Sequence, residues 1–334
     1  MKRFVFTCGD INGIGPELVI KALNKISHAE TDSFIFAVPM NVFEKTASDS
    51  LASFNYDVVK KQADIAGCKR NVVIYDIGKG RQNTGKATKE SGRISFLSIQ
   101  KSFELVAENR ESALITAPIS KTALFLAGIN YPGHTEMVAG WCKRKDYVMT
   151  FLSKKMIAAL LTIHIPIKDV SKSLKKNEII AKIHTVVNTL ERDLGIEKPR
   201  IALLGLNPHA GELGIMGWEE QRLFNPIINM REFSGKLYGA FSPDAFFANK
   251  LYGKYDAVIG CYHDQVLIPF KLMNFSSGVN YTAGLPIIRT SPDHGTAFDI
   301  AGKNAADPSS LLEAFYYAKK ILKNRLKNGK ENYI

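Results

Sequence analysis

Short apolar runs alternate with amphipathic stretches along the whole chain, and this alternation constrains the fold most strongly. Residues 3–8 predict a buried strand, and residues 16–26 predict a helix that begins with proline, which is tolerated in a first helical turn. Strands that alternate with helices are typical of an α/β protein with largely parallel sheets and helices on both faces. Further strands are expected at residues 113–116, 156–163, 200–206 and 256–260.

Helical periodicity separates these runs. Residues 92–108 predict a helix that turns Phe96, Ile99, Phe103 and Val106 towards the core. Residues 174–193 and 219–232 are also expected to be helical. A helix near the C-terminus is expected to bury one apolar face: Leu311, Phe315, Ala318 and Leu322.

Length and composition indicate an ordinary globular protein. The 334 residues suggest two domains or one large one, and 46% hydrophobic with 23% charged residues excludes a disordered, collagen-like or coiled-coil chain. The longest apolar runs fall far short of the roughly 20 residues that cross a bilayer. The apolar stretch near the N-terminus is too short for a secretory signal, so a cytoplasmic location is expected.

The net charge of +12 favours an anionic partner: nucleic acid, a membrane or a phosphorylated small molecule. The densest basic segment, residues 319–327, is expected on the outer face of the terminal helix, without interleaved aromatic residues or a nucleic-acid motif. We therefore interpret it as a solvated helix face. The four cysteines form no CxxC pair, which argues against a disulfide framework or a thiolate zinc site.

Polar or glycine-rich turns follow the predicted strands. Ligands of parallel α/β sheets gather at the carboxyl ends of the strands, so these turns are expected to form one site. They comprise residues 9–17, 116–121, 162–166, 205–212 and 260–265. The first turn contains no GxGxxG, and no Walker lysine pattern is present, which argues against an ordinary Rossmann site and a P-loop ATPase.

His164, His209 and His263 each follow a predicted strand. Three neutral imidazoles are a common ligand set for a catalytic divalent metal with an open coordination position. The alternative is that each is an ordinary, partly buried histidine, because no local motif such as HExxH links them.

Two further groups suit an anionic ligand. His134 and Thr135 stand at a predicted helix start, where backbone N–H groups favour an anion, although Thr135 could simply cap the helix. Lys271, Asn280 and Arg289 recur at nine-residue intervals and would suit a small phosphorylated acid. Three unrelated surface residues remain the alternative.

Together these segments resemble the PdxA family, the 4-hydroxythreonine-4-phosphate dehydrogenases of pyridoxal phosphate biosynthesis. The resemblance runs from residue 9 to about 308. It is carried by GDINGIGPEL (9–18), TAPISK (116–121), GHTE (133–136), NPHAGE (207–212), YHDQ (262–265) and HGTAFDIAGK (294–303). The last motif is similar to the HGSAPDIAGK loop of isopropylmalate and isocitrate dehydrogenases, which holds the adenosine part of the nicotinamide cofactor.

The resemblance implies an isocitrate/isopropylmalate dehydrogenase-like fold of two α/β domains. Residues 1–128 plus 270–334 would form a terminal domain with the cofactor loop, and 129–269 a central domain with metal ligands and dimer contacts. It also implies a homodimer, with the site between the domains and His263 reaching across from the partner subunit.

The implied site falls on residues already singled out. Metal binding (zinc, cobalt or magnesium) is assigned to His164, His209 and His263. Substrate binding is assigned to His134, Thr135, Lys271, Asn280 and Arg289. Cofactor binding is assigned to His294, Gly295, Thr296, Ala297 and Asn304. The candidates for acid–base catalysis are Lys271, Asp244 and Asp264.

The implied reaction is the NAD- or NADP-dependent oxidation of 4-phosphooxy-L-threonine to a β-keto acid that then loses carbon dioxide. Three alternatives stay open: a dehydrogenase of 4-phospho-D-threonate or erythronate, a three-histidine metallohydrolase, and a nucleic-acid-binding protein. Ile11 and Asn12 stand where the family usually has Pro and Ala, which leaves the substrate preference open. The choice between NAD and NADP, the metal and the general base are not decided by the sequence.

Overall fold

The computed structural model describes residues 1–274 and 277–329, which divide between two compact units. Unit 1 comprises Met1–Cys142 and Pro286–Ile334, and unit 2 comprises Lys143–Leu285. These boundaries differ from the expected ones at 128/129 and 269/270. Helix α5 (His134–Trp141) stays with unit 1 because Trp141 packs on Phe96 and Phe103. Residues 275, 276 and 330–334 of the expected terminal domain lie outside the described ranges.

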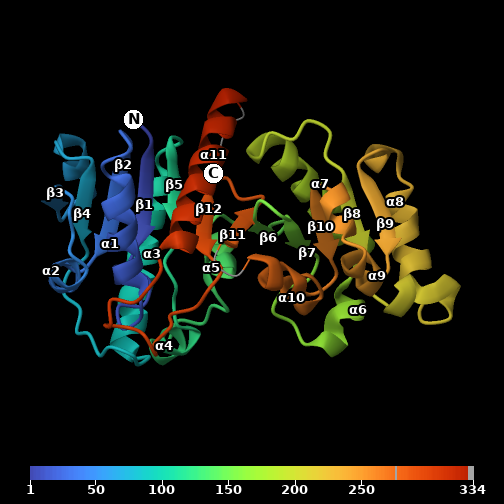
Figure 1. Cartoon of the computed structure of the whole chain (residues 1–334), viewed down its shortest axis with the longest axis horizontal. Coiled ribbons are helices and arrows are strands. Elements are labelled where there is room, and N and C mark those ends of the chain that lie inside the picture. Colours follow the sequence, from blue (N-terminus) through green and yellow to red (C-terminus); the bar gives the residue numbers. More distant parts are fainter. Residues whose placement is uncertain (275–276, 330–334) are drawn as a thin grey trace. The chain divides into compact units, whose positions relative to one another are not determined.

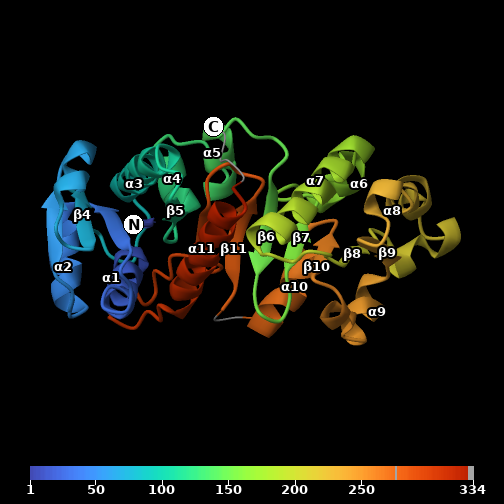
Figure 2. The same ribbon diagram turned by 90° about the horizontal axis from the view of Figure 1, so that it is seen from above.

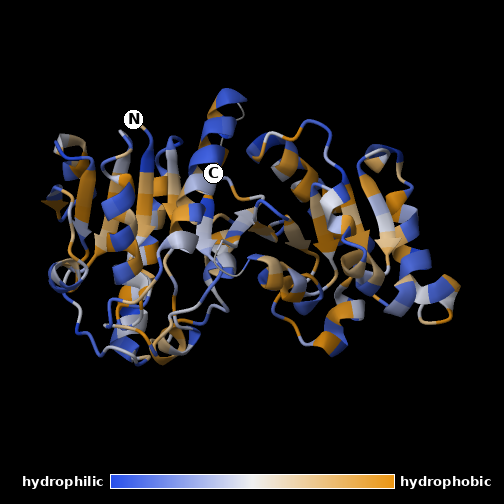
Figure 3. Ribbon diagram, in the orientation of Figure 1, coloured by the Kyte–Doolittle hydropathy of each residue, from blue (hydrophilic) through white to orange (hydrophobic). Residues whose placement is uncertain are grey.

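Unit 1 contains six parallel strands in the order β3-β4-β2-β1-β5-β12. They are β1 (Arg3–Thr7), β2 (Ser33–Val38), β3 (Tyr56–Val59), β4 (Val72–Asp76), β5 (Ser112–Ile115) and β12 (Arg289–Pro292). The strands expected at residues 3–8 and 113–116 are confirmed. Figure 3 shows these strands as mainly hydrophobic, as expected for a sheet covered on both faces.

Helices cover both faces of the unit 1 sheet. They are α1 (Gly15–Ile26), α2 (Met40–Asp49), α3 (Lys89–Ala107), α4 (Lys121–Leu126), α5 and α11 (Ser309–Lys327). Helices α3 and α4 lie on one face, and α1, α2 and α11 lie on the other (Figures 1 and 2). The apolar face predicted for α11 is confirmed, since Leu311, Phe315, Ala318 and Leu322 are fully buried.

Helix α3 differs from its prediction in the face that it buries. Ile99 and Val106 are buried, but Phe96 and Phe103 are half-buried against Trp141. Small serines face the sheet instead and allow a close approach. Ser98 Oγ donates to the Ala37 carbonyl oxygen (2.7 Å), and Ser95 Oγ donates to that of Gly9 (2.8 Å). These bonds fix the turn that follows β1.

Unit 2 contains strands in the order β11-β6-β7-β10-β8-β9. They are β6 (Val148–Leu152), β7 (Ala158–Leu160), β8 (Ile201–Leu204), β9 (Leu237–Phe241), β10 (Ala257–Gly260) and β11 (Val279–Ala283). β6 pairs antiparallel with β11 and β7, and the remaining pairs are parallel. The pairing with β6 keeps β11 in this unit, beyond the boundary expected at 269.

The helices of unit 2 are α6 (Val170–Ser173), α7 (Lys176–Asn188), α8 (Asn225–Ile228), α9 (Pro243–Ala248) and α10 (His263–Asn274). The predicted helix at 174–193 is α7 followed by a π-helical turn, Thr189–Asp193. The predicted helix at 219–232 is broken into a π-helical turn, α8 and a 3-10 turn. Within the described ranges, no helix is long and apolar enough to cross a membrane.

Candidate active site

The glycine turn after β1 brings together two other segments of unit 1. Gly9 has φ +63°, and a Cβ there would lie 2.3 Å from the Pro118 carbonyl oxygen in TAPISK. A Cβ on Gly13 would lie 2.7 Å from the Thr296 carbonyl oxygen, which accepts a hydrogen bond from Ile14 N (3.0 Å). Both glycines are therefore required by close backbone approach.

The expected cofactor residues lie on one loop, residues 294–304. His294 is half-buried, with Nδ1 3.1 Å from the Gly295 carbonyl oxygen. Ala297 and Asn304 have φ +42° and +52°, conformations that L-residues seldom adopt. Lys21 of α1 donates to the Asn304 carbonyl oxygen (2.9 Å) and ties the end of the loop to unit 1.

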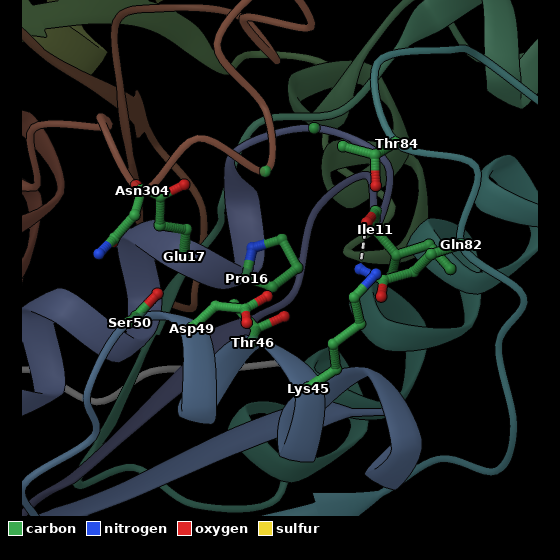
Figure 4. Close-up of a pocket in the computed structure, with 12 residues that line it drawn as sticks. Ile11, Pro16, Glu17, Lys45, Thr46, Asp49, Ser50, Gln82, Thr84 and Asn304 are labelled. Atoms are coloured by element: carbon green, nitrogen blue, oxygen red, sulfur yellow. Dashed lines mark hydrogen bonds between the residues drawn. The ribbon is translucent and has the colours of Figure 1, made fainter.

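A hollow of about 440 Å³, including space open to solvent, lies beside this loop (Figure 4). It is lined by Ile11, Gly13, Pro16, Glu17, Lys45, Thr46, Asp49, Ser50, Gln82, Thr84, Gly302 and Asn304. The residues from α2 and from the 82–84 segment were not predicted, because no local motif marks them. Hydroxyl and amide side chains of the kind that hydrogen-bond a polar ligand are part of this lining: Thr46, Ser50, Gln82, Thr84 and Asn304.

A buried arginine forms the centre of a second cluster in unit 1. Arg289 begins β12 and is 1% exposed. Its Nε and Nη2 donate to Thr116 Oγ1 (3.0 and 2.8 Å), and Nη2 also donates to Ser291 Oγ (2.9 Å). Thr116 begins the TAPISK motif, so the strand ends β5 and β12 together fix the guanidinium. Neither hydroxyl partner was predicted from the sequence.

The predicted anion-binding residues His134 and Thr135 begin α5 in the same unit. Thr135 is 2% exposed, and His134 Nε2 is buried with no hydrogen-bond partner among the described residues. Burial and the charge of Arg289 hold the pKa of His134 well below 6.5. Burial lowers the pKa of Arg289 to about 9, against the opposing effect of the Glu136 carboxylate. At neutral pH the cluster therefore pairs a neutral imidazole with a desolvated cation.

The three predicted metal ligands lie in unit 2. His164 follows β7 with φ +31°, and His209 lies in the turn Pro208–Gly214 with φ +52°; both are exposed. His263 begins α10, and its ring centroid is 6.1 Å from that of His164. Exposed imidazoles held in strained backbone conformations are characteristic of functional loops.

Imidazole donors fit a divalent metal chemically. However, no group of three or more His, Cys, Asp or Glu residues in the described part of the chain lies close enough to hold one. A single chain therefore brings His164 and His263 near each other but does not assemble a complete ligand set.

Carboxylates partner two of these histidines. Asp264 Oδ1 lies 2.6 Å from His263 Nδ1. Asp244 accepts a hydrogen bond from Ser242 Oγ, and this bond is the main reason why the pKa of Asp244 is lowered. The backbone N–H of Ala245 and, more weakly, the charge of His209 lower this pKa further. Carboxylates that bond the far nitrogen of a metal-binding histidine orient the ring. The two carboxylates among the three candidates for acid–base catalysis thus each have a hydrogen-bond partner.

Glu220 fixes the loop that carries His209. Its buried carboxylate accepts hydrogen bonds from the backbone N–H of Leu206 (2.7 Å) and Asn207 (2.8 Å), and from Asn207 Nδ2 (2.9 Å). The sequence contained a usable signal, since a Glu-Glu pair follows NPHAGE within an otherwise apolar stretch.

The three residues that recur at nine-residue intervals are divided between the two units. Lys271 is exposed on α10 and Asn280 lies on β11, both in unit 2, whereas Arg289 is in unit 1. Asn280 Oδ1 is buried and has no hydrogen-bond partner in the described ranges. A buried polar atom of this kind is expected to face a ligand or water.

Known proteins match nearly the whole chain. The family described as "Pyridoxal phosphate biosynthetic protein PdxA" matches residues 29–318. The chain is 39% identical to the 4-hydroxythreonine-4-phosphate dehydrogenase of Sulfurihydrogenibium sp. (94% of this chain, 96% of that protein). It is 34% identical to the D-threonate 4-phosphate dehydrogenase of Salmonella typhimurium (96% of this chain, 99% of that protein).

Solved structures are also similar to this chain over nearly its whole length. A 4-hydroxythreonine-4-phosphate dehydrogenase from Klebsiella pneumoniae has a TM-score of 0.82 at 34% identity, covering 96% of this chain and 98% of that one. An isocitrate dehydrogenase from Methylococcus capsulatus has a TM-score of 0.51 at 12% identity, covering 97% and 87%, and this likeness confirms the predicted fold class. With these matches across almost its full length, the chain belongs to the PdxA family of dehydrogenases.

Proposed function

We propose that this enzyme oxidises 4-phosphooxy-L-threonine with NAD or NADP in pyridoxal phosphate biosynthesis. The product is 2-amino-3-oxo-4-phosphooxybutanoate, which loses carbon dioxide to give 3-amino-2-oxopropyl phosphate. The observation that carries the proposal is the buried Arg289–His134 cluster, in a family whose members are named for phosphorylated hydroxy acids.

This cluster suits a phosphate group for a physical reason. Arginine binds phosphate through a planar fork, and the burial of Arg289 strengthens the attraction of its guanidinium for an anion. The neutral imidazole of His134 can bond a phosphate oxygen through Nε2, which has no partner among the described residues. We propose that the hydroxyl of Thr135, and Lys271 and Asn280 of unit 2, complete the substrate contacts.

Oxidation removes a hydride from the hydroxyl-bearing carbon and a proton from its oxygen. A nicotinamide cofactor supplies the hydride acceptor, and we propose that the hollow and His294, Gly295, Thr296, Ala297 and Asn304 hold it. We propose that the proton acceptor is one of Lys271, Asp244 and Asp264. The β-keto acid then loses carbon dioxide because its ketone accepts the electron pair.

We propose that His164, His209 and His263 hold a divalent metal, to which two copies of the chain contribute. Such an ion is a Lewis acid that stabilises an alkoxide. Unit 2 supports a homodimer, because it exposes large apolar side chains that a monomer would leave in water. They are Leu213 (84%), Ile215 (81%), Leu272 (83%) and Ile268 (58%). Light scattering should give a mass near twice 37.0 kDa.

The second candidate is oxidation of D-threonate 4-phosphate, favoured by the 34% identical Salmonella relative of that name. This substrate differs from the first at carbon 2, where a hydroxyl replaces the amino group. Membership of a dehydrogenase family argues against the metallohydrolase and the nucleic-acid-binding protein.

The test compares both substrates by the absorbance of reduced nicotinamide, with NAD and NADP, before and after chelation. We expect turnover of the amino acid, loss of it on chelation and recovery with zinc, cobalt or magnesium. Turnover of D-threonate 4-phosphate alone would show that the second candidate is the activity of this enzyme. No reduction with either compound in metal-replete protein would contradict both.

A further inference from the structure

The side chain of Asn12, in the turn between β1 and α1, is fully buried and fully bonded. Its Nδ2 donates to the Lys86 carbonyl oxygen (2.8 Å) and to Thr88 Oγ1 (3.1 Å). Its Oδ1 accepts a hydrogen bond from Asn83 N (2.6 Å). One carboxamide thus bonds three residues of a single segment, residues 82–88, that lies about 70 positions further along the chain.

Backbone groups of the same turn hold the same segment. Gly85 N donates to the Asn12 carbonyl oxygen (2.8 Å), and Gln82 Nε2 donates to that of Ile11 (2.9 Å; dashed in Figure 4). Residues 82–88 lie between β4 and α3 and belong to no helix or strand. Their position therefore depends largely on residues 11 and 12.

This segment forms one wall of the hollow beside the 294–304 loop. Gln82 and Thr84 line the hollow. Thr84 also packs closely on the loop, since a Cβ on Gly302 would lie 2.9 Å from Thr84 Cγ2. The width of the hollow between the first turn and the loop therefore depends on where residues 82–88 lie.

We propose that Asn12 is a positioning residue for the nicotinamide cofactor: it holds residues 82–88 as the wall of the hollow and so sets cofactor affinity without touching the cofactor. This inference rests on the proposed function, which assigns the hollow to the cofactor. When only a fraction of molecules has the binding-competent wall, the apparent dissociation constant rises by the inverse of that fraction.

The test uses the full-length protein and two matched variants. Asn12→Ala removes the three side-chain bonds. Asn71→Ala is the control, because Asn71 Nδ2 also bonds a distant carbonyl oxygen of unit 1, that of Ser27 (2.7 Å), but does not line the hollow. Hydrogen exchange of residues 82–88 is measured by mass spectrometry, and the dissociation constant of reduced NAD or NADP by fluorescence without substrate.

For Asn12→Ala we expect faster exchange in residues 82–88 and a dissociation constant raised roughly tenfold, with kcat at saturating cofactor within about twofold of wild type. Asn71→Ala should change none of these. If the alanine variant does not fold, Thr88→Val is used instead: it removes one of the three Asn12 side-chain bonds, together with the Ser91 N–H bond to Thr88 Oγ1, and should give a smaller change in the same direction.

Unchanged exchange, or faster exchange with an unchanged dissociation constant, would overturn the inference. If wild type and Asn71→Ala also fail to bind either cofactor, the proposed function fails, and the inference fails with it. The two failures are distinguishable because the first leaves wild-type binding intact.

Discussion

The buried candidate residues of unit 1 and the candidate metal ligands of unit 2 are held in opposite ways. In unit 1, Asn12, Thr135 and Arg289 are 0 to 2% exposed, and Asn12 and Arg289 are held by hydrogen bonds from several segments. In unit 2, His164 and His209 are exposed and have positive φ angles. Packing holds the unit 1 residues in place, whereas His164 and His209 of unit 2 lie on loops whose positive φ angles cost conformational energy.

This contrast indicates how the candidate side chains of each unit are held in position. A buried polar group without a partner is costly, so the unit 1 residues must already be arranged in the folded chain. The unit 2 histidines have little packing to arrange them and gather no third ligand in the described residues. In the described residues, packing thus arranges the buried unit 1 side chains, whereas the proposed metal ligands of unit 2 do not form a complete set.

The largest effect is expected from Arg289→Met. It removes the proposed phosphate contact and the attraction between the Arg289 cation and the Glu136 carboxylate. We expect kcat/KM for the phosphorylated substrate to fall about 10³-fold and unfolding free energy to fall by about 3–5 kcal/mol. Steady-state kinetics and urea unfolding measure both. Arg325→Met is the control, since Arg325 is equally buried and bonds the Pro286 carbonyl oxygen; it should lower stability but leave the substrate KM unchanged.

His209→Ala should separate activity from stability in the other unit. Turnover should fall at least about 10²-fold through loss of a metal ligand, while the Tm of the chelated protein stays within about 2 °C because the side chain is exposed. His209→Gly should lose activity equally but gain about 1 kcal/mol of stability, because glycine tolerates φ +52°. A large drop in Tm for the alanine variant would contradict the contrast between the units.

Sequence patterns predicted the fold well where periodicity was strong. The strands at residues 3–8 and 113–116 and the buried face of α11 follow from apolar spacing. The pattern predicted α3 and the burial of Ile99 and Val106 correctly, but it misplaced Phe96 and Phe103. Serines face the sheet in their place, and hydropathy does not reveal such a close backbone approach. Of the helix predicted at 219–232, residues 220–228 are helical, but the π-helical turn changes to α8 beside Pro226, which lacks an N–H donor, and α8 ends at Ile228.

The site was predictable only where a motif carried it. His134 and Arg289 were found, but Thr116, Ser291 and Glu136 were not, because their roles arise from tertiary contacts. The lining of the hollow by α2 was missed for the same reason. The significance of Asn12 becomes clear only once residues 82–88 lie beside it.

Unit 1 should show a pH signature from His134. Because its folded pKa lies well below 6.5, the unfolded chain takes up a proton near 6.5 that the folded chain does not. Stability should therefore fall as pH drops below 6.5, by up to about 1.4 kcal/mol per pH unit relative to His134→Asn. Urea unfolding of both proteins between pH 7.5 and 5.5 measures the difference; a difference independent of pH would contradict the buried, neutral imidazole.

The smallest effect concerns thiol reactivity. Cys8, Cys142 and Cys261 are buried, burial raises the pKa of Cys8 to about 12, and Cys68 is half-buried. An aromatic disulfide reagent at pH 8 should modify one thiol slowly in the native protein and four after unfolding. Cys68→Ser should abolish the native reaction. Fast modification of two or more native thiols would show that the buried regions open readily.

The central contrast is tested most directly on one enzyme preparation before and after chelation: the dissociation constant is measured with reduced cofactor, and turnover is measured separately with oxidised cofactor and substrate. We predict that chelation abolishes turnover but leaves the cofactor dissociation constant within about twofold, because the unit 1 hollow needs no metal. Loss of both turnover and cofactor binding on chelation would contradict this prediction, because the proposed cofactor site of unit 1 would then depend on the metal.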